Sequence, residues 1–353
     1  APAGRIVVDP SVATPVTINT GTTGSVTVEI APSISVTGGS INFVGLSATT
    51  LINRTDLIAD GGVWTFGSSI TMNNQGRVGS RSGGTFGARF TGNVGAFVFE
   101  GSGTSLSFSG TSIIIGQAIT VLPTQTLTLA GSGSTTGWTL LQPVVLRGGR
   151  VNLGGQFSPP DLANFSRDPL AMGEVHLIGT FRLYRASYTL DDSTGSWIIA
   201  EPGRFGGTIS AVSASATDRG TLNITQGARL IHRGGGLASR PTFSNLTLNG
   251  DLTLDQPDAR LLVSAGLTLN GTIRLAASGA GLDVNQSNTI DTTSAGTIIF
   301  DPAGGGAPRS ITMDQTARLT IGPNVTVRGG NGRINVASGG LLTNNGLIRA
   351  DLR

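Results

Sequence analysis

The chain contains no cysteine, which excludes disulfide bonds and thiolate metal sites. It also contains no lysine, so all 23 of its basic residues are arginines. Charged residues make up 12% of the chain, compared with about 25% in an ordinary soluble domain. The arginines are spread from Arg5 to Arg353 and the net charge is only +3, whereas a nucleic-acid binder gathers its basic residues on one face. We therefore expect no nucleic-acid partner.

Long apolar runs are missing as well. No stretch of about 18 apolar residues occurs, so the sequence predicts no membrane-spanning helix. The two histidines, His176 and His232, stand in no zinc-ligand spacing, and no glycine-rich loop leads into a recognisable helix. We expect neither a metal site nor a cofactor.

What the chain has in excess is glycine, with 54 of 353 residues, together with a short recurring unit. The unit reads Leu-Thr-Leu-Asn-Gly at 246–250 and again at 267–271, and an earlier pair with the same 21-residue spacing lies at 106–110 and 127–131. Apolar and polar residues alternate within most copies before glycine ends the run, which is typical of one short strand followed by a tight turn. Strand units that recur about every 20–25 residues are typical of a β-solenoid.

The sequence therefore predicts an all-β fold: a single elongated parallel β-solenoid, a right-handed β-helix, with about 15 solenoid turns of about 23 residues each. Leu, Ile and Val are expected to stack inward from one solenoid turn to the next, with Thr and Ser facing solvent and Gly and Asn at the corners. We expect solenoid turns over 1–156, an irregular aromatic-rich insertion or irregular solenoid turns over 157–205, and regular solenoid turns over 206–353.

The repeated units, together with the closing run from Gly339 to Asp351, resemble those of β-helical bacterial surface proteins, namely filamentous-haemagglutinin-like adhesins and autotransporter passengers. The resemblance covers 206–353 well and 6–156 loosely, and it is one of repeat pattern. It implies a role outside the cell or at the cell surface. The chain opens with Ala1 and carries no apolar signal segment, which is typical of an exported protein whose signal has been removed.

Carboxylate pairs were considered as catalytic groups, because β-helical enzymes that degrade polysaccharides place carboxylates together on one face of neighbouring solenoid turns. The best candidate is Asp191-Asp192, but the run Asp-Asp-Ser-Thr-Gly is typical of a solvated tight turn. Asp255 and Asp258, on either side of Pro257, have the same interpretation. We expect no catalytic residue and no enzyme, with a polysaccharide-degrading β-helix as the less favoured alternative.

The segment 157–205 holds the residues best suited to recognition, because exposed aromatic side chains stack on sugar rings or anchor protein interfaces. The candidate binding residues are Phe165, Tyr184, Tyr188, Trp197, Arg182 and Arg185. The alternative is that the aromatic side chains of this segment fill the core of irregular solenoid turns.

The ends of a solenoid expose unpaired strand edges, which are templates for pairing with another chain. The candidate assembly residues are Ile6, Val7 and Val8 near the start and Leu347 and Ile348 near the end. The first hypothesis is an extracellular, non-enzymatic structural protein that polymerises by end-to-end or strand-exchange contacts into a filament, tube or surface layer. The alternative is a cell-surface adhesin rod that binds a glycan or a host protein through 157–205.

Overall fold

The protein, described here by a computed structural model, is an all-β parallel β-solenoid of about 13 solenoid turns. The structure describes residues 16–19, 26–30, 34–45, 48–131, 137–171, 173–202, 206–211, 218–225, 228–234, 237, 240–302 and 306–351. Within this part of the chain every strand ladder is parallel, and the one helical element longer than a single residue is the 3-10 helix η1 (Pro159–Leu162). No described helix is long and apolar enough to cross a membrane. The predicted fold class is confirmed.

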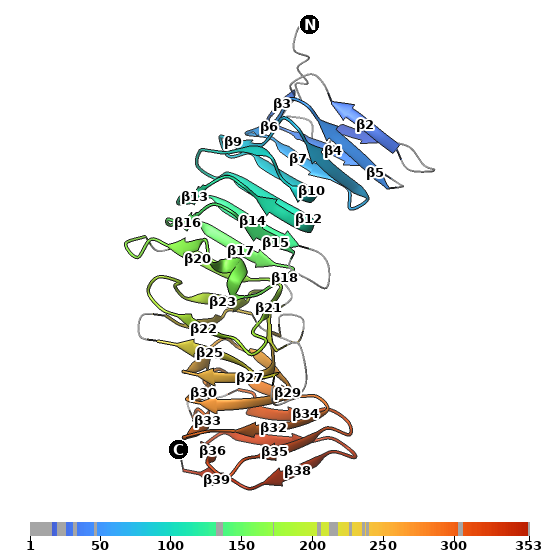
Figure 1. Ribbon diagram of the computed structural model, residues 1–353. Helices are drawn as coiled ribbons and strands as arrows, with labels where there is room; N and C mark the ends of the chain where they lie inside the picture. Colours follow the sequence, from blue (N-terminus) through green and yellow to red (C-terminus); the bar gives the residue numbers. More distant parts are fainter. Residues whose placement is uncertain are drawn as a thin grey trace, which may run out of the picture. The chain divides into compact units, whose positions relative to one another are not determined.

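The chain divides into two compact units, Ala1–Glu174 and Val175–Arg353, which are called unit 1 and unit 2. In unit 1 most strands belong to one 19-stranded sheet, and most of the others form a four-stranded and a three-stranded sheet, so that strands from successive solenoid turns lie side by side (Figure 1). The strands of unit 1 are β1 (Val16–Asn19), β2 (Val26–Ile30), β3 (Ile34–Thr37), β4 (Ser40–Val44), β5 (Thr49–Asn53), β6 (Asp56–Asp60), β7 (Val63–Phe66), β8 (Ile70–Asn74), β9 (Arg77–Arg81), β10 (Thr85–Asn93), β11 (Ala96–Phe99), β12 (Ser105–Ile115), β13 (Ile119–Val121), β14 (Thr126–Gly131), β15 (Trp138–Leu140), β16 (Val144–Leu146), β17 (Arg150–Gly154), β18 (Gln156–Phe157) and β19 (Phe165–Arg167).

The core of unit 1 consists of inward columns, in which each side chain packs on its register partner in the next solenoid turn. One such column runs through Trp64, Phe86, Leu106, Leu127 and Val151, and all five side chains are fully buried. Between them on each strand stand residues that face outward, which gives the alternating burial of β12 and β14. Alternation with period two thus places one half of each strand in the core and the other half on an outer face.

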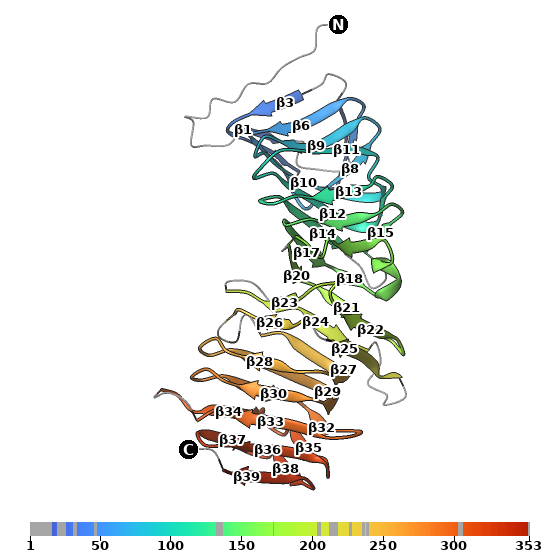
Figure 2. The same cartoon turned by 90° about the vertical axis from the view of Figure 1, so that its left-hand side faces the viewer.

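Unit 2 is built on the same principle, and Figure 2 shows its strands, coloured yellow to red, following one another from one solenoid turn to the next. Its strands are β20 (Glu174–Leu177), β21 (Thr180–Arg182), β22 (Ser187–Leu190), β23 (Trp197–Ala200), β24 (Thr208–Ser210), β25 (Gly220–Ile224), β26 (Leu230–His232), β27 (Thr242–Asn249), β28 (Leu252–Leu254), β29 (Arg260–Asn270), β30 (Thr272–Leu275), β31 (Gly281–Val284), β32 (Ser287–Asp291), β33 (Gly296–Phe300), β34 (Arg309–Met313), β35 (Arg318–Ile321), β36 (Val325–Gly329), β37 (Gly332–Val336), β38 (Leu341–Asn344) and β39 (Leu347–Ala350).

The repeats recognised in the sequence stack directly on one another. Residues 246–249 of β27 pair in register with 267–270 of β29, so that Leu246 faces Leu267 and Leu248 faces Leu269. The earlier copies, in β12 and β14, pair in the same way from Leu106 opposite Leu127 onward. All of these leucines are fully buried, which confirms that the repeat unit is one inward-packing strand.

The segment 157–205 belongs to the solenoid turns and contains the boundary between the two units. In unit 1, β19 pairs with β16, and in unit 2, β21, β22 and β23 pair with β24, β25 and β26. The segment is irregular in that it holds η1 and a register shift between Ile198 and Ala200.

Candidate binding groove

A groove of about 580 Å³ lies in unit 2 at the corner where β25, β27 and β29 lead into β26, β28 and β30. The corner between β25 and β26 runs from Thr225 to Arg229. In the next solenoid turn the corner consists of Gly250 and Asp251, and in the one after it of Gly271 alone. A Cβ atom at Gly271 would lie 2.2 Å from the carbonyl oxygen of Gly250, so the two short corners stack without side chains between them. The groove follows from this difference in corner length.

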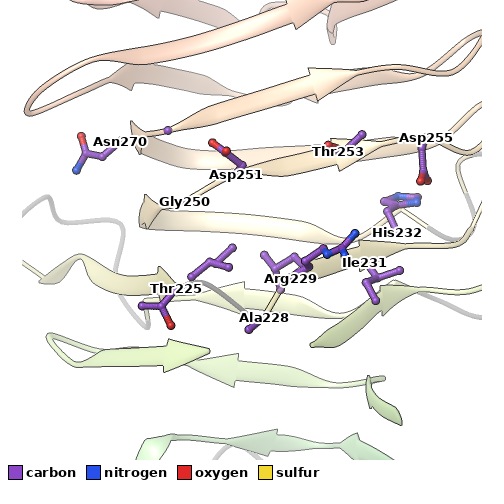
Figure 3. A pocket seen from close by; sticks show the side chains of 13 residues that line it. Thr225, Ala228, Arg229, Ile231, His232, Gly250, Asp251, Thr253, Asp255 and Asn270 are labelled. Carbon is purple, nitrogen blue, oxygen red and sulfur yellow. The ribbon is translucent and has the colours of Figure 1, made fainter. Parts of the chain in front are cut away.

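The two walls of the groove come from neighbouring strands of one sheet. Arg229 and Ile231 lie on one side, and Asp251, Thr253 and Asp255 lie on the other (Figure 3). Thr253 sits in β28 between two buried leucines, so the two aspartates and the threonine share its outward face. Ile231 and Thr253 are register partners, which places the two walls on adjacent strands.

The charged groups of the groove are exposed, and none of them forms an ion pair with a described residue. Asp251 accepts a hydrogen bond from the backbone N–H of Thr272 at 2.7 Å through one carboxylate oxygen. Asp255 accepts one from the side-chain amide of Gln256 at 3.1 Å. Elsewhere in unit 2 arginines pair across solenoid turns, as Arg274 does with Asp301 at 2.7 Å. The groove therefore presents one guanidinium and two carboxylates that form no ion pair within the described part of the chain.

His232 forms part of the groove lining and is buried at the end of β26. Its Nε2 lies 2.9 Å from the carbonyl oxygen of Arg260, so the ring donates its proton there and Nδ1 carries the lone pair in the neutral form. Burial lowers the pKa of His232, which opposes the raising effect of the backbone carbonyls and of the charge on Asp255. The imidazole is consequently neutral at physiological pH and adds no positive charge to the groove.

A ladder of asparagines borders the groove. The side-chain amide of Asn249 donates to Asn223 at 2.7 Å, and that of Asn270 donates to Asn249 at 2.8 Å. Asn270 itself accepts from the hydroxyl of Thr292 at 2.9 Å and lines the groove. The ladder ties four solenoid turns together at this corner, so the walls stand on a rigid base.

The two carboxylates of the groove stand far apart along their strand. Paired carboxylates that hydrolyse glycosides stand about 5–9.5 Å apart. Asp251 and Asp255 are four residues apart along an extended strand, which corresponds to about 13 Å between their Cα atoms. Among the described residues no cluster of three or more His, Asp or Glu could hold a metal ion. The groove offers acceptors on one wall, a cationic donor on the other and a partly apolar side at Ile231.

Of the carboxylates considered from the sequence, Asp191, Asp192 and Asp258 lie in tight turns, as predicted. Asp191 accepts hydrogen bonds from the N–H of Ser193 at 2.8 Å and of Thr194 at 3.1 Å, and from the hydroxyl of Ser193 at 2.7 Å. The Ser193 hydroxyl is the main reason that the pKa of Asp191 lies below its usual value. Asp258 lies in the tight turn after β28, with φ of 56°. Asp255 precedes that tight turn, but its side chain also forms part of the groove, which sequence reasoning did not recognise.

The aromatic candidates fall into two groups. Phe165 and Trp197 are buried in β19 and β23, so the prediction of an exposed platform is wrong for these two and the core-filling alternative holds. Tyr188 is mostly buried as well, with its ring 5.0 Å from that of Phe181 and 5.5 Å from that of Trp197. Burial raises the pKa of Tyr188, with a smaller contribution from Asp191.

The remaining members of that set lie at the surface of unit 2 but are not brought into the groove. Tyr184 is exposed, and the guanidinium carbon of Arg185 lies 5.2 Å from the centre of its ring. Arg185 also pairs with Asp218 at 2.6 Å, which is the main reason that the pKa of its guanidinium is raised. Arg182 is half-buried in β21. Their role in binding stays a prediction.

The candidate assembly residues near the end of the chain, Leu347 and Ile348, are exposed in β39. Those near the start, Ile6, Val7 and Val8, lie outside the described residues.

Two groove residues were missed by sequence reasoning altogether, Arg229 and Asp251. One signal was available: in the run from Asp251 to Asp255, leucines alternate with Asp, Thr and Asp, which indicates a single strand that carries two carboxylates on its outward face. Arg229 carried no comparable signal, because its place depends on the length of the corner before β26.

No protein-family model matches the chain, and no protein of curated function matches its sequence. Among solved structures the chain is similar to the crystal structure of a hyper-glycosylated fragment of TibA, whose glycosylation was catalysed by TibC. The match covers 98% of this chain and 97% of that one, with 13% sequence identity and a TM-score of 0.27. An identity and a TM-score as low as these carry no argument on function.

Proposed function

We propose that the protein is an exported, non-enzymatic β-solenoid of adhesin type, which binds a saccharide in the groove of unit 2. The observation that carries the proposal is the set of unmatched charged groups on a rigid sheet: Arg229 on one wall, Asp251 and Asp255 on the other. Exposed charged groups that form no ion pair with a described residue are available to a ligand, and a ligand rich in hydroxyl groups supplies both donors and acceptors for them. The repeat pattern typical of bacterial surface proteins supports the extracellular location.

A saccharide fits the groove better than a protein loop does. The carboxylates of Asp251 and Asp255 accept hydrogen bonds from sugar hydroxyls, and Arg229 donates to hydroxyl or ring oxygens. The volume of about 580 Å³ matches a site for a small ligand. Ile231, which is half-buried, gives the apolar face of a sugar ring a surface to contact.

The test is a screen of neutral and amino saccharides by calorimetry with the intact chain and three variants. Arg229→Ala and Asp255→Asn each remove a group that would contact the ligand, and we expect binding to weaken about tenfold in each. Arg328→Ala is the matched control, because Arg328 is an arginine of the same sheet that lies outside the groove and pairs with Asp351 at 3.0 Å. Absence of any saccharide that binds, or equal binding by all four proteins, contradicts the proposal.

A second candidate function, end-to-end assembly, is favoured by the last described solenoid turn, which comprises β37, β38 and β39. Four of its large apolar side chains are exposed, namely Val336, Leu341, Leu347 and Ile348. Unpaired strand edges with apolar inward residues bind a further parallel strand by the same contacts that join the solenoid turns below. We propose that a second copy of this chain covers the turn.

A further inference from the structure

Unit 1 carries two further grooves, and strand β10 contributes residues to both. One, of about 280 Å³, is lined by Phe66, Ser68, Gly87, Arg89 and Ser109, among others. The other, of about 570 Å³, is lined by neutral polar side chains from the ends of β5, β8 and β10, namely Thr50, Thr71, Asn73, Thr91 and Asn93.

The strand register brings the two grooves together at Arg89. Met72, which lines the larger groove, pairs with Phe90 of β10, and Arg89, the residue before Phe90, lines the smaller groove. In β12 the register partner of Arg89 is Ser109. Arg89 therefore stands where β10 leads from one groove to the other. This surface is called the Arg89 face.

Arg89 is the charged residue of the Arg89 face, because neither groove is lined by a carboxylate. One guanidinium nitrogen donates to the backbone carbonyl of Ser68 at 2.9 Å, which orients the side chain. No described residue forms an ion pair with it. Glu29 of β2, the strand that pairs with β5, forms its ion pair with Arg54 at 2.5 Å.

Other arginines of unit 1 show what a structural arginine does in this fold. Arg77 pairs with Asp56 at 2.6 Å, Arg81 with Asp60 at 3.0 Å and Arg147 with Asp168 at 2.9 Å, each one solenoid turn away. Arg89 also lies on a paired strand, but its register partner in β12 is Ser109, a neutral residue. A half-buried cation that forms no ion pair with any described residue leaves that place to a ligand.

From these contacts we infer that the Arg89 face binds a carboxylated saccharide, of the hexuronic acid class, with the carboxylate of the ligand on Arg89. A guanidinium matches the geometry of a carboxylate through two parallel hydrogen bonds. The threonine hydroxyls and asparagine amides around it bond sugar hydroxyls without adding charge. One cation amid neutral groups suits one carboxylate, whereas a nucleic acid needs a row of cations.

This inference goes beyond the proposed function, because the Arg89 face lies in unit 1 and the groove of the proposed function lies in unit 2. The ligands also differ: the Arg89 face binds an acid, whereas the groove of unit 2 carries two carboxylates of its own. The two sites fail or succeed independently. Arg89 variants test the first, and Arg229 variants test the second.

The experiment measures binding of hexuronic acid oligosaccharides and of their methyl esters to the full chain by calorimetry. The esters keep the sugar backbone and lose the charge. We expect the acids to bind, and the esters to bind about tenfold more weakly or not at all. Equal binding of acid and ester, or no binding of the acid, overturns the inference.

Variants locate the site. Arg89→Gln should weaken binding of the acid about tenfold, and Arg89→Lys less, because a lysine keeps the charge but not the paired geometry. Arg81→Gln is the matched control, since Arg81 is an exposed arginine of the same unit that pairs with Asp60. Arg229→Ala should leave this binding unchanged. If Arg81→Gln or Arg229→Ala weakens binding as much as Arg89→Gln does, the acid binds elsewhere and the inference fails.

A further variant fills the groove without touching any charge. A Cβ atom added at Gly87 meets only the Cβ of Ser107, at 3.5 Å, so a side chain there is accommodated by the backbone and projects outward. Gly87→Val should abolish binding of the acid while the thermal unfolding midpoint stays within a few degrees of the parent. Unchanged binding in a folded Gly87→Val protein contradicts the inference.

Discussion

Ile348 is the register partner of Val327 in the parallel pair of β39 and β36, yet Ile348 is 44% exposed where Val327 is 1% exposed. Both belong to one inward column, whose earlier members Leu252, Ile273 and Ile298 are fully buried or nearly so. The side chain at the end of this column has an apolar neighbour on one side only. Its exposure is the physical basis of the assembly candidate.

If a second copy covers this turn, Ile348→Asp should prevent assembly, because a carboxylate would be buried at the contact without a partner. Thr343→Asp is the matched control, since Thr343 lies in the same solenoid turn and is exposed. Sedimentation velocity of the intact chain and both variants, at low and high salt, is the measurement. We expect assembly of the parent and of Thr343→Asp at both salt concentrations, because apolar contacts are not screened. A parent chain that stays monomeric at high concentration shows that no second copy binds there, and the covering element is then a further stretch of polypeptide or another partner.

Trp197→Ala should lower the free energy of unfolding by about 3–5 kcal/mol, because it leaves a cavity beside Phe181 and Tyr188. Tyr184→Ala, at an exposed position in the same segment, should change it by less than about 0.5 kcal/mol. Denaturant unfolding gives both values. A loss below about 1 kcal/mol for Trp197→Ala would argue against the packing described for this segment.

Asn53 should be a stability determinant of unit 1. It is fully buried, donates to Asn74 at 2.8 Å and to the carbonyl of Thr55 at 2.8 Å, and accepts from the N–H of Thr55 at 3.2 Å. Asn53→Ala leaves these groups without partners, so we expect a loss of about 1–3 kcal/mol in the free energy of unfolding. The control is Asn73→Ala, at an exposed position of β8, which should have almost no effect. Equal effects of the two substitutions would contradict the role assigned to the buried amide.

His232 should make the protein less stable as the pH falls below neutrality. Burial lowers its folded-state pKa below the ordinary value of 6.5, so between these two values the unfolded chain binds a proton that the folded chain does not. The stabilisation is complete above about pH 6.5 and declines as the pH falls. Thermal unfolding from pH 8 to pH 5 should show a shallower decline for His232→Gln than for the parent. Identical profiles would indicate that His232 titrates alike in both states.

Much of the fold could be predicted from the sequence because each repeat unit is a short stretch that indicates one strand and one tight turn. Leu246 and Leu267 occupy equivalent positions in two identical repeat units, and in the sheet these two residues are register partners. Burial of Trp197 and Phe165 could not be read in the same way, because an aromatic residue on an irregular strand is compatible with either face. The alternation that assigns faces elsewhere is lost there: all four residues of β23 are buried.

The candidate sites depended on features that are not periodic. The groove of unit 2 lies where one corner is longer than the next two. The length of a corner in the sequence does not show which part of the surface stays uncovered in the fold. Arg89 looks like any other arginine in the sequence, and only the register shows that its partner in β12 is Ser109 instead of an aspartate. Both features become visible only when the pairing of the strands is known.

The most direct test of the central claim is hydrogen–deuterium exchange of the full chain with and without the best saccharide from the binding screen. If the saccharide occupies the groove, added protection should concentrate in peptides that contain β26 and β28, and it should disappear in Arg229→Ala. Protection spread over other solenoid turns, or none at a concentration that saturates binding, would contradict the assignment of the groove as the binding site.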